Sequence, residues 1–233
     1  MRAVSVVGFK KSGKTRTAVN LCKSLKARGF RVAAAKFSGH GFDRSGSDTA
    51  QLLEACDSVA GISDGETAVF WNGRRFLQDI LPMLDADVLV VEGGKSLEWL
   101  PRVLVLKDES EAAELDRGLA LATFGEIGAA GLPAITDMNE LADLVTKRGF
   151  ALPGLDCGEC GREDCGGLAR DIVSGQASAE DCRARSSEVE ITVGGARLAM
   201  NPFVEGIISS TIRGMLGGLK GYAPGQKIEI KID

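Results

Sequence analysis

The chain lacks any apolar stretch long enough to cross a membrane. Its longest runs of this kind, such as those at residues 88–91 and 103–106, contain four residues each, whereas a membrane-spanning helix needs about 20. A secretory leader is also not expected, since a short apolar segment from Met1 runs directly into Gly8 with no small-residue cleavage site. We therefore expect a cytoplasmic protein with no membrane partner.

Histidine is nearly absent, because His40 is its sole occurrence. A Ser-His-Asp or Cys-His catalytic arrangement needs an imidazole beside the nucleophile, and His40 lies in a polar, glycine-rich segment. Covalent catalysis of that kind is therefore not expected. For His40 itself, a structural or solvent-facing role fits the sequence as well as a functional role does.

Acidic residues are missing from the first 42 positions, although the whole chain has a net charge of only −4. The overall charge predicts no nucleic-acid partner. Within those 42 positions, however, the basic residues form a block whose summed field attracts an anion. Its members are Arg2, Lys10, Lys11, Lys14, Arg16, Lys23, Lys26, Arg28, Arg31 and Lys36.

The 233 residues are 44% hydrophobic and 26% charged, which is typical of a globular protein with a core. The apolar pattern predicts strands at 3–7, 31–36, 59–62, 67–71, 87–91, 102–106 and 119–123, and helices at 14–28, 48–56, 75–84 and 139–148. Strands that alternate with helices predict an α/β fold with a mostly parallel sheet.

A linker is expected at residues 150–154, which divides the chain into a domain at 1–150 and a second part at 151–233. After residue 185 the pattern predicts two strands around Gly194-Gly195, an amphipathic helix after Asn201-Pro202 and a strand at 227–232. This is a small ββαβ unit. Its helix is expected to pack on its own strands, and a partner surface is the alternative.

Residues 8–15, GFKKSGKT, fit the pattern G-x-x-x-x-G-K-[ST] at every fixed position. The two glycines let successive backbone N–H groups point at one centre, and Lys14 can reach the β- and γ-phosphates of a nucleotide. The hydroxyl of Thr15 can bind Mg²⁺, at the start of a helix whose positive end faces the phosphates. A P-loop NTPase site is therefore predicted, with nucleotide contacts from Gly8, Lys10, Lys11, Ser12, Gly13, Lys14, Thr15 and Arg16.

A magnesium–nucleotide complex also needs a carboxylate at a strand end, and Glu92 directly follows the apolar residues 88–91. The alternative for Glu92 is an ordinary surface acid, and Lys95 could face phosphate or solvent. Hydrolysis at such a site works by positioning and charge neutralisation, with Lys14 and Glu92 as the catalytic candidates.

Residues 1–150 resemble the MobB family, the molybdopterin-guanine dinucleotide biosynthesis proteins B. The resemblance rests on residues 8–15, Ala35-Lys36, 39–43 (GHGFD), 45–49 (SGSDT) and 91–95 (VEGGK). It implies GTP binding, weak hydrolysis and a helper role in attaching a nucleotide to molybdopterin. It also adds Lys36 and Asp43 to the nucleotide and Mg²⁺ candidates, and Asp48 to the catalytic candidates. Phe37 and Ser47 depart from the family pattern, which commonly has His and Lys there.

Four of the six cysteines crowd into one segment, as Cys157-x2-Cys160-x4-Cys165-x16-Cys182. In a chain without an export signal, this clustering favours a metal site over disulfides. Four thiolates suit both a [4Fe-4S] cluster and zinc. Zinc ribbons usually carry two CxxC pairs, so the asymmetric spacing favours iron–sulfur. The other two cysteines, Cys22 and Cys56, are expected to be small buried hydrophobes.

The segment 156–182 also resembles the [4Fe-4S] module of corrinoid iron–sulfur proteins and Rnf-complex B subunits. The match includes DCGEC at 156–160, Leu168-Ala169, Ser174-Gly175 and Glu180-Asp181-Cys182. The resemblance implies a [4Fe-4S] cluster on all four cysteines. A redox cluster and a purely structural cluster both remain open.

Three functions fit the sequence. The first is a GTP-dependent accessory protein, a weak GTPase, in molybdenum or tungsten cofactor assembly, whose partner is a molybdopterin nucleotidyltransferase or a molybdo- or tungsto-enzyme. The second is a redox protein in which nucleotide hydrolysis drives electron transfer or metallocentre activation in a partner enzyme. The third is a non-catalytic scaffold that binds nucleotide for stability. A homodimer across the nucleotide is one open arrangement.

Overall fold

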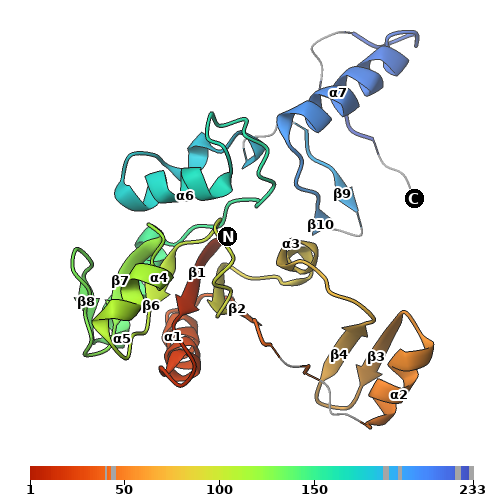
Figure 1. Cartoon of the computed structure of the whole chain (residues 1–233). Coiled ribbons are helices and arrows are strands. Elements are labelled where there is room, and N and C mark those ends of the chain that lie inside the picture. Colours follow the sequence, from red (N-terminus) through yellow and green to blue (C-terminus); the bar gives the residue numbers. More distant parts are fainter. Residues whose placement is uncertain (40, 43–45, 186–188, 194–195, 224–226, 231–233) are drawn as a thin grey trace.

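The computed structural model of the chain describes residues 1–39, 41–42, 46–185, 189–193, 196–223 and 227–230 (Figure 1). Within these residues, six parallel strands form one sheet in the order β2-β5-β1-β6-β7-β8. The strands are β1 (Arg2–Val7), β2 (Val32–Lys36), β5 (Val88–Glu92), β6 (Arg102–Leu104), β7 (Ala120–Phe124) and β8 (Ala134–Ile135). The predicted α/β fold with a mostly parallel sheet is confirmed.

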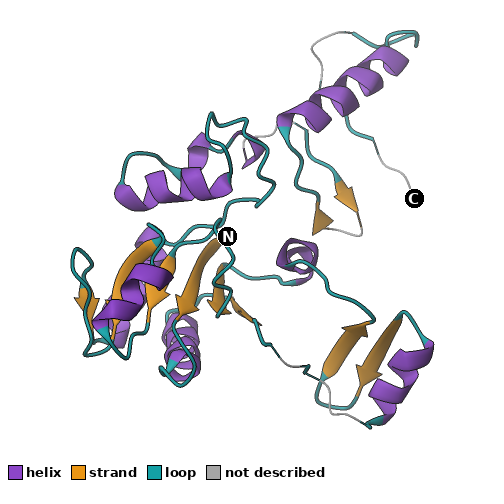
Figure 2. Ribbon diagram, in the orientation of Figure 1, coloured by secondary structure: helices purple, strands orange, loops and turns teal. Residues whose placement is uncertain are grey.

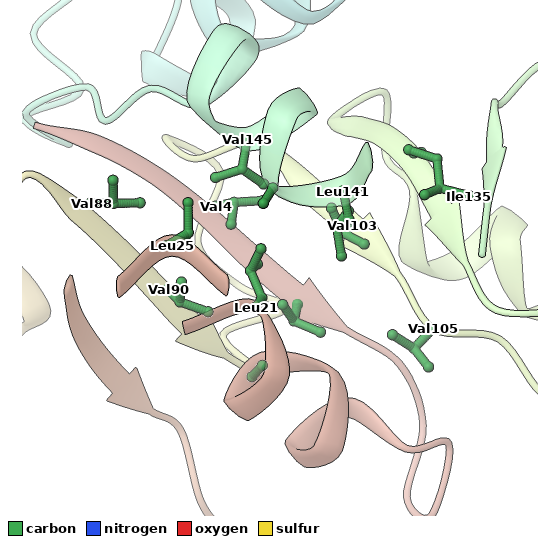
Figure 3. Packing of buried hydrophobic residues seen from close by; sticks show 14 residues of the cluster. Val4, Leu21, Leu25, Val88, Val90, Val103, Val105, Ile135, Leu141 and Val145 are labelled. Atoms are coloured by element: carbon green, nitrogen blue, oxygen red, sulfur yellow. The ribbon is translucent and has the colours of Figure 1, made fainter. Parts of the chain in front are cut away.

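One face of the sheet is covered by two long helices, α1 (Lys14–Ala27) and α5 (Met138–Arg148). Successive side chains of a strand face opposite sides, so alternate residues such as Val4 and Val88 point to this face. There they pack against Leu21 and its neighbours, as Figure 3 shows. This packing fixes α1 directly behind the end of β1, where the glycine-rich loop joins them.

The other face of the sheet is covered by the short helix α3 (Leu77–Ile80) and by the cysteine segment with its helix α6 (Cys165–Ser174). Leu89 of β5, Leu168 of α6 and Cys182 belong to one buried cluster on this side. A fully buried leucine contributes about 1.5–3 kcal/mol. The cysteine segment is therefore part of the core of the sheet. These contacts join residues on both sides of the domain boundary predicted near residue 150. The division into domains at 1–150 and 151–233 therefore remains a prediction.

A separate lobe contains α2 (Asp48–Ala55), β3 (Ser58–Ile62) and β4 (Thr67–Trp71). It stands apart from the sheet in Figure 2. The two strands match the predicted spans but pair antiparallel with each other, because the tight turn at residues 63–66 can join only antiparallel neighbours. Helix α2 has no buried residue and Cys56 is exposed, so the expected burial of Cys56 was wrong.

The C-terminal part differs from the predicted ββαβ unit. Strands β9 (Thr192–Val193) and β10 (Ala196–Arg197) are only two residues long, and residues 227–230 form no strand. Such a short ladder offers too little apolar surface to pack a helix. Accordingly, α7 (Pro202–Leu216) has no fully buried residue. Phe203 is 67% exposed and Met215 73%, while Ile208, Ile212 and Leu216 are partly buried.

The remaining helical elements are short: η1 (Leu81–Met83), η2 (Glu109–Glu111), α4 (Ala112–Leu115), η3 (Ala179–Asp181) and η4 (Arg183–Arg185). The helix expected at 75–84 is divided into α3 and η1, because Pro82 lacks the N–H that would continue the α-helical ladder. Over the described part of the chain, no helix combines the length and apolarity that spanning a membrane requires.

Candidate functional site

The loop between β1 and α1 has the backbone that a phosphate site needs. Lys11 and Gly13 have positive φ angles of 64° and 98°, and a side chain at Gly8 would collide with the carbonyl oxygen of Val105 and with the hydroxyl of Ser12. Helix α1 begins with no side-chain cap and no acidic residue in its first turn. Its first N–H groups therefore remain available to an anion.

Glu92 connects this loop to the neighbouring strands. In the sheet, Glu92 is in register with Val6 of β1 and with Lys36 of β2. Its carboxylate accepts hydrogen bonds from Thr15 Oγ1 at 2.7 Å and from Lys36 Nζ at 3.1 Å. Burial would raise the pKa of Glu92, but these hydrogen bonds and the charges of Lys36 and Lys14 lower it below its ordinary value. An ionised carboxylate beside a threonine hydroxyl is a ligand pair that suits Mg²⁺.

Among the described residues, no carboxylate is bonded directly to the ammonium group of Lys14. It donates to the carbonyl oxygen of Phe9 at 2.7 Å. Burial lowers the pKa of Lys14, and the nearby charges of Lys95, Lys36 and Lys107 lower it further, against the opposing effect of Glu92. Several cations thus share a small region at the carboxyl end of the sheet. A polyanion bound there would relieve their mutual repulsion.

The structure brings some of the predicted site residues together and leaves others apart. The backbone of 8–15, with Glu92 and Lys36, forms one site, and Lys10, Lys11 and Arg16 are exposed beside it. Asp48 begins α2 on the separate lobe, away from α1 in Figure 1, and is not brought to the phosphate loop. Asp43 lies outside the described residues.

Arg102 is a buried residue beside the site that the sequence pattern did not reveal. It is 0% exposed, and its Nη2 donates to the carbonyl oxygens of Lys95 at 2.7 Å and Leu97 at 3.1 Å. Its Nη1 donates to the carbonyl oxygen of Leu115 at 2.7 Å. Lys95, held by this contact, lies 3.6 Å above the ring of Phe9 in the phosphate loop. The sequence feature that could have indicated this role is an arginine at the start of an otherwise apolar strand.

The four clustered cysteines come from a loop, a helix start and a buried turn. Cys182 is buried, and Cys160 and Cys165 pack against the same hydrophobic cluster. Burial raises the pKa of Cys182, and the nearby Cys160 and Cys157 raise it further, while backbone N–H groups that follow in the chain oppose the rise. Three thiols on one apolar surface, with Cys157 close by, fit a metal cluster that four thiolates hold.

Helix α6 is not among the helices predicted from the sequence. It begins at Cys165 with Asp164 as its cap, whose carboxylate accepts from the N–H of Gly167 at 2.7 Å. Burial raises the pKa of Cys165 to about 11. Within the described ranges, no three His, Cys, Asp or Glu side chains are already grouped around a single ion position.

Two family models match the two parts of the chain that contain these residues. The family model for molybdopterin guanine dinucleotide synthesis protein B matches residues 3–123. A second model, whose description names a candidate Fe-S cluster, matches residues 152–184 and so includes all four clustered cysteines.

Two similar proteins carry the provisional name molybdopterin-guanine dinucleotide biosynthesis adapter protein. The one from Methanocaldococcus jannaschii is 30% identical over 246 residues, covering 100% of this chain and 98% of its own length. The one from Bacillus subtilis is 27% identical over 121 residues, which is 48% of this chain and 69% of that protein. The crystal structure of Bacillus subtilis MobB superposes with a TM-score of 0.53 at 23% identity, over 64% of this chain and 99% of that one. This last likeness shows the fold.

Proposed function

The chain belongs to the family of molybdopterin guanine dinucleotide synthesis protein B, and we propose that it is a GTP-binding accessory protein, with weak GTPase activity, in the biosynthesis of that cofactor. The observation that carries this proposal is the group formed by the phosphate loop, Thr15, Glu92 and Lys36. The partner would be a molybdopterin nucleotidyltransferase or a molybdo- or tungsto-enzyme, and the proposed place of action is the cytoplasm. The choice of GTP over ATP rests on family membership.

In this proposal the chain acts mainly by positioning. The backbone N–H groups of the loop and the start of α1 bind the phosphates, and Lys14 exchanges the carbonyl oxygen of Phe9 for phosphate oxygens. Thr15 and Glu92 would hold Mg²⁺, which neutralises phosphate charge. Weak hydrolysis follows if Asp48 stays on its separate lobe, since that candidate then cannot orient a water molecule.

For the second site we propose a [4Fe-4S] cluster held by Cys157, Cys160, Cys165 and Cys182. Such a cluster supplies one-electron redox chemistry when bound. The buried Cys182 and the apolar residues around it would exclude water from one side, while Cys157 is partly exposed. A structural role is also consistent with the way this segment packs on the sheet.

One observation favours the alternative function, a redox protein driven by nucleotide. The segment that follows Glu92 contacts both sites: Lys95 lies over Phe9 of the phosphate loop, while Glu98 pairs with Arg170 of α6 at 3.7 Å. Trp99 belongs to the same buried cluster as Cys182. Movement of this segment on nucleotide binding would reach the cysteine site. A cluster potential that shifts with bound nucleotide would support this alternative over the accessory role.

Nucleotide binding is tested with anaerobically purified protein and fluorescent GTP and ATP analogues, with and without magnesium. We expect Mg²⁺-dependent binding that prefers GTP. Lys14→Ala should weaken it about 10- to 100-fold, because it removes a charged hydrogen-bond donor, whereas Lys23→Ala on the exposed face of α1 should not. Failure of every nucleotide to bind would overturn the proposal.

Cluster binding is tested by iron and sulfide analysis of the same preparation. We expect about four irons per chain. Cys182→Ser should lower the iron content strongly, whereas Cys56→Ser, which changes an exposed cysteine of the separate lobe, should leave it unchanged. Zinc in place of iron and sulfide would contradict the proposed cluster.

A further inference from the structure

A cavity of about 310 Å³ lies where the sheet meets the cysteine segment. Its walls come from residues 74–78, from residues 96–99, and from Gly154, Asp156, Asp164 and Gly166 of the cysteine segment. None of residues 8–15 lines it, so it is separate from the phosphate loop. Small-molecule sites often occupy such junctions, and this volume is at the lower end of their usual range.

The apolar part of the lining combines aromatic side chains with Leu77 and Leu97. Phe37, Phe76 and Trp99 all contribute to the cavity. The Trp99 indole lies close against Gly154, where an added Cβ would be only 3.1 Å from the ring. Aromatic side chains of this kind can pack against a planar ring system.

The polar part of the lining is mixed, but its carboxylates are already engaged. Glu98 pairs with Arg117 at 3.0 Å and with Arg170 at 3.7 Å. Asp156 accepts from the N–H of Cys165 at 2.9 Å, and Asp164 caps α6. These interactions occupy much of the hydrogen-bonding capacity of the carboxylates. The cationic side chains that line the cavity are therefore not paired with them.

Arg74 and Arg75 are those cations. Both are exposed at the cavity, and within the described part of the chain neither makes a hydrogen bond or an ion pair. Two adjacent guanidinium groups can bind a phosphate with paired, charge-assisted hydrogen bonds. The nearby pairing of Glu98 with Arg117 and Arg170 reduces the repulsion that an anion would otherwise meet.

From this arrangement we propose that the cavity binds a small planar heterocycle that carries a phosphate group. The ring packs against Trp99 and Phe37, and the phosphate lies on Arg74 and Arg75. A phosphorylated pterin has this chemistry and is the first probe to use, a choice that rests on the proposed function. The site itself rests on the cavity, and its occupant does not compete with nucleotide at the phosphate loop.

The intact chain offers a direct reporter. It has two tryptophans, and Trp71 is on the separate lobe, so Trp71→Phe leaves Trp99 as the sole indole. Titration with 6-hydroxymethylpterin monophosphate should quench or shift the fluorescence of Trp99 with saturation. The unphosphorylated pterin should bind about tenfold or more weakly, because the charged hydrogen bonds are lost. GMP and inorganic phosphate are tested in parallel to separate ring, nucleotide and phosphate contributions.

The double variant Arg74→Gln/Arg75→Gln should weaken binding of the pterin phosphate about tenfold or more. Lys23→Gln/Lys26→Gln removes the same charge from the exposed face of α1 and should leave binding unchanged. Equal binding by both double variants, or no saturable response to any probe, would overturn the proposal. Lys14→Ala should lose GTP yet keep the pterin phosphate, so failure of the GTP proposal and failure of this one are distinguishable.

Discussion

At the scale of single residues, Glu92 and Gly8 show how much of the phosphate site depends on individual atoms. Glu92 receives hydrogen bonds from two different elements, Thr15 of α1 and Lys36 of β2. Gly8 has no room for a side chain, because the strand and the loop close around it. Glu92 places a negative charge in the site, and Gly8 leaves room for the loop to close. Substitution of either residue should have a measurable effect.

Glu92 should contribute stability that depends on pH. Its folded-state pKa lies below the ordinary value of 4.5, so this stabilisation is present above about pH 4.5 and is lost as the pH falls through the lower folded pKa. In Glu92→Gln the contribution is absent at every pH. Urea titrations should therefore give a difference between wild type and variant that is constant near neutral pH and shrinks below pH 4.5. A difference that grows on acidification would contradict this assignment.

Gly8→Ala should destabilise the folded chain by about 1–3 kcal/mol, the usual effect of overpacking. The new methyl group would press on the carbonyl oxygen of Val105 and on Ser12, so nucleotide binding should fall as well. Gly39→Ala is the matched control, since among the described residues no atom beyond its chain neighbours lies within 4 Å of a Cβ there. Its effect should stay within about 0.5 kcal/mol. Equal unfolding midpoints for the two variants would show that the loop relaxes freely.

At the scale of elements, the segment from Gly93 to Leu100 connects the phosphate loop with the cysteine segment. Arg102 of β6 contacts this segment by donating hydrogen bonds to the carbonyl oxygens of Lys95 and Leu97. Desolvation lowers the pKa of Arg102, which shows that burying this cation has a cost. The carbonyl contacts offset that cost and fix the path of the segment.

Arg102→Lys should therefore destabilise the chain by about 2–4 kcal/mol, although it keeps the charge. A lysine cannot reproduce the fork that reaches three carbonyl groups, and buried acceptors are left without donors. Arg117→Lys, at a half-exposed position, should change stability by less than about 0.5 kcal/mol. Chemical unfolding monitored by circular dichroism compares the two, and similar losses in both would argue against a positioning role for Arg102.

At the scale of the whole molecule, the sheet is covered by α1 and α5 on one face and by the cysteine segment on the other. The two candidate sites therefore share one set of strands. The lobe around α2 and the helix α7 add no buried helix residue to this core. A destabilising substitution in the cysteine segment should consequently also destabilise the phosphate-loop side of the sheet, whereas a substitution in α7 should not.

Leu168→Ala tests this shared core. Leu168 is 1% exposed on α6, and its truncation should cost about 2–5 kcal/mol. Loss of secondary structure and loss of cluster absorbance should shift together in urea. Met215→Ala on the exposed face of α7 should change neither by more than about 0.5 kcal/mol. A variant that loses the cluster signal while the sheet keeps its wild-type midpoint would show that the two halves unfold separately.

The sequence by itself determined those features that depend on local spacing. The strand–loop–helix order around residues 8–15, the carboxylate at the end of β5 and the spacing of the four cysteines were all visible there. So was the parallel α/β fold, since a regular alternation of short apolar runs and amphipathic stretches permits few alternatives. The family relationship to MobB, read from the same motifs, was confirmed by the comparisons.

Only the tertiary structure decided which distant residues meet. It paired Thr15 and Lys36 with Glu92, buried Arg102 behind the loop and packed α6 on the sheet. It also left Asp48 on a separate lobe and α7 without a fully buried residue. Local patterns record which side of an element is apolar, but they do not record which other element covers that side. That choice is made when the whole chain buries its surface at once.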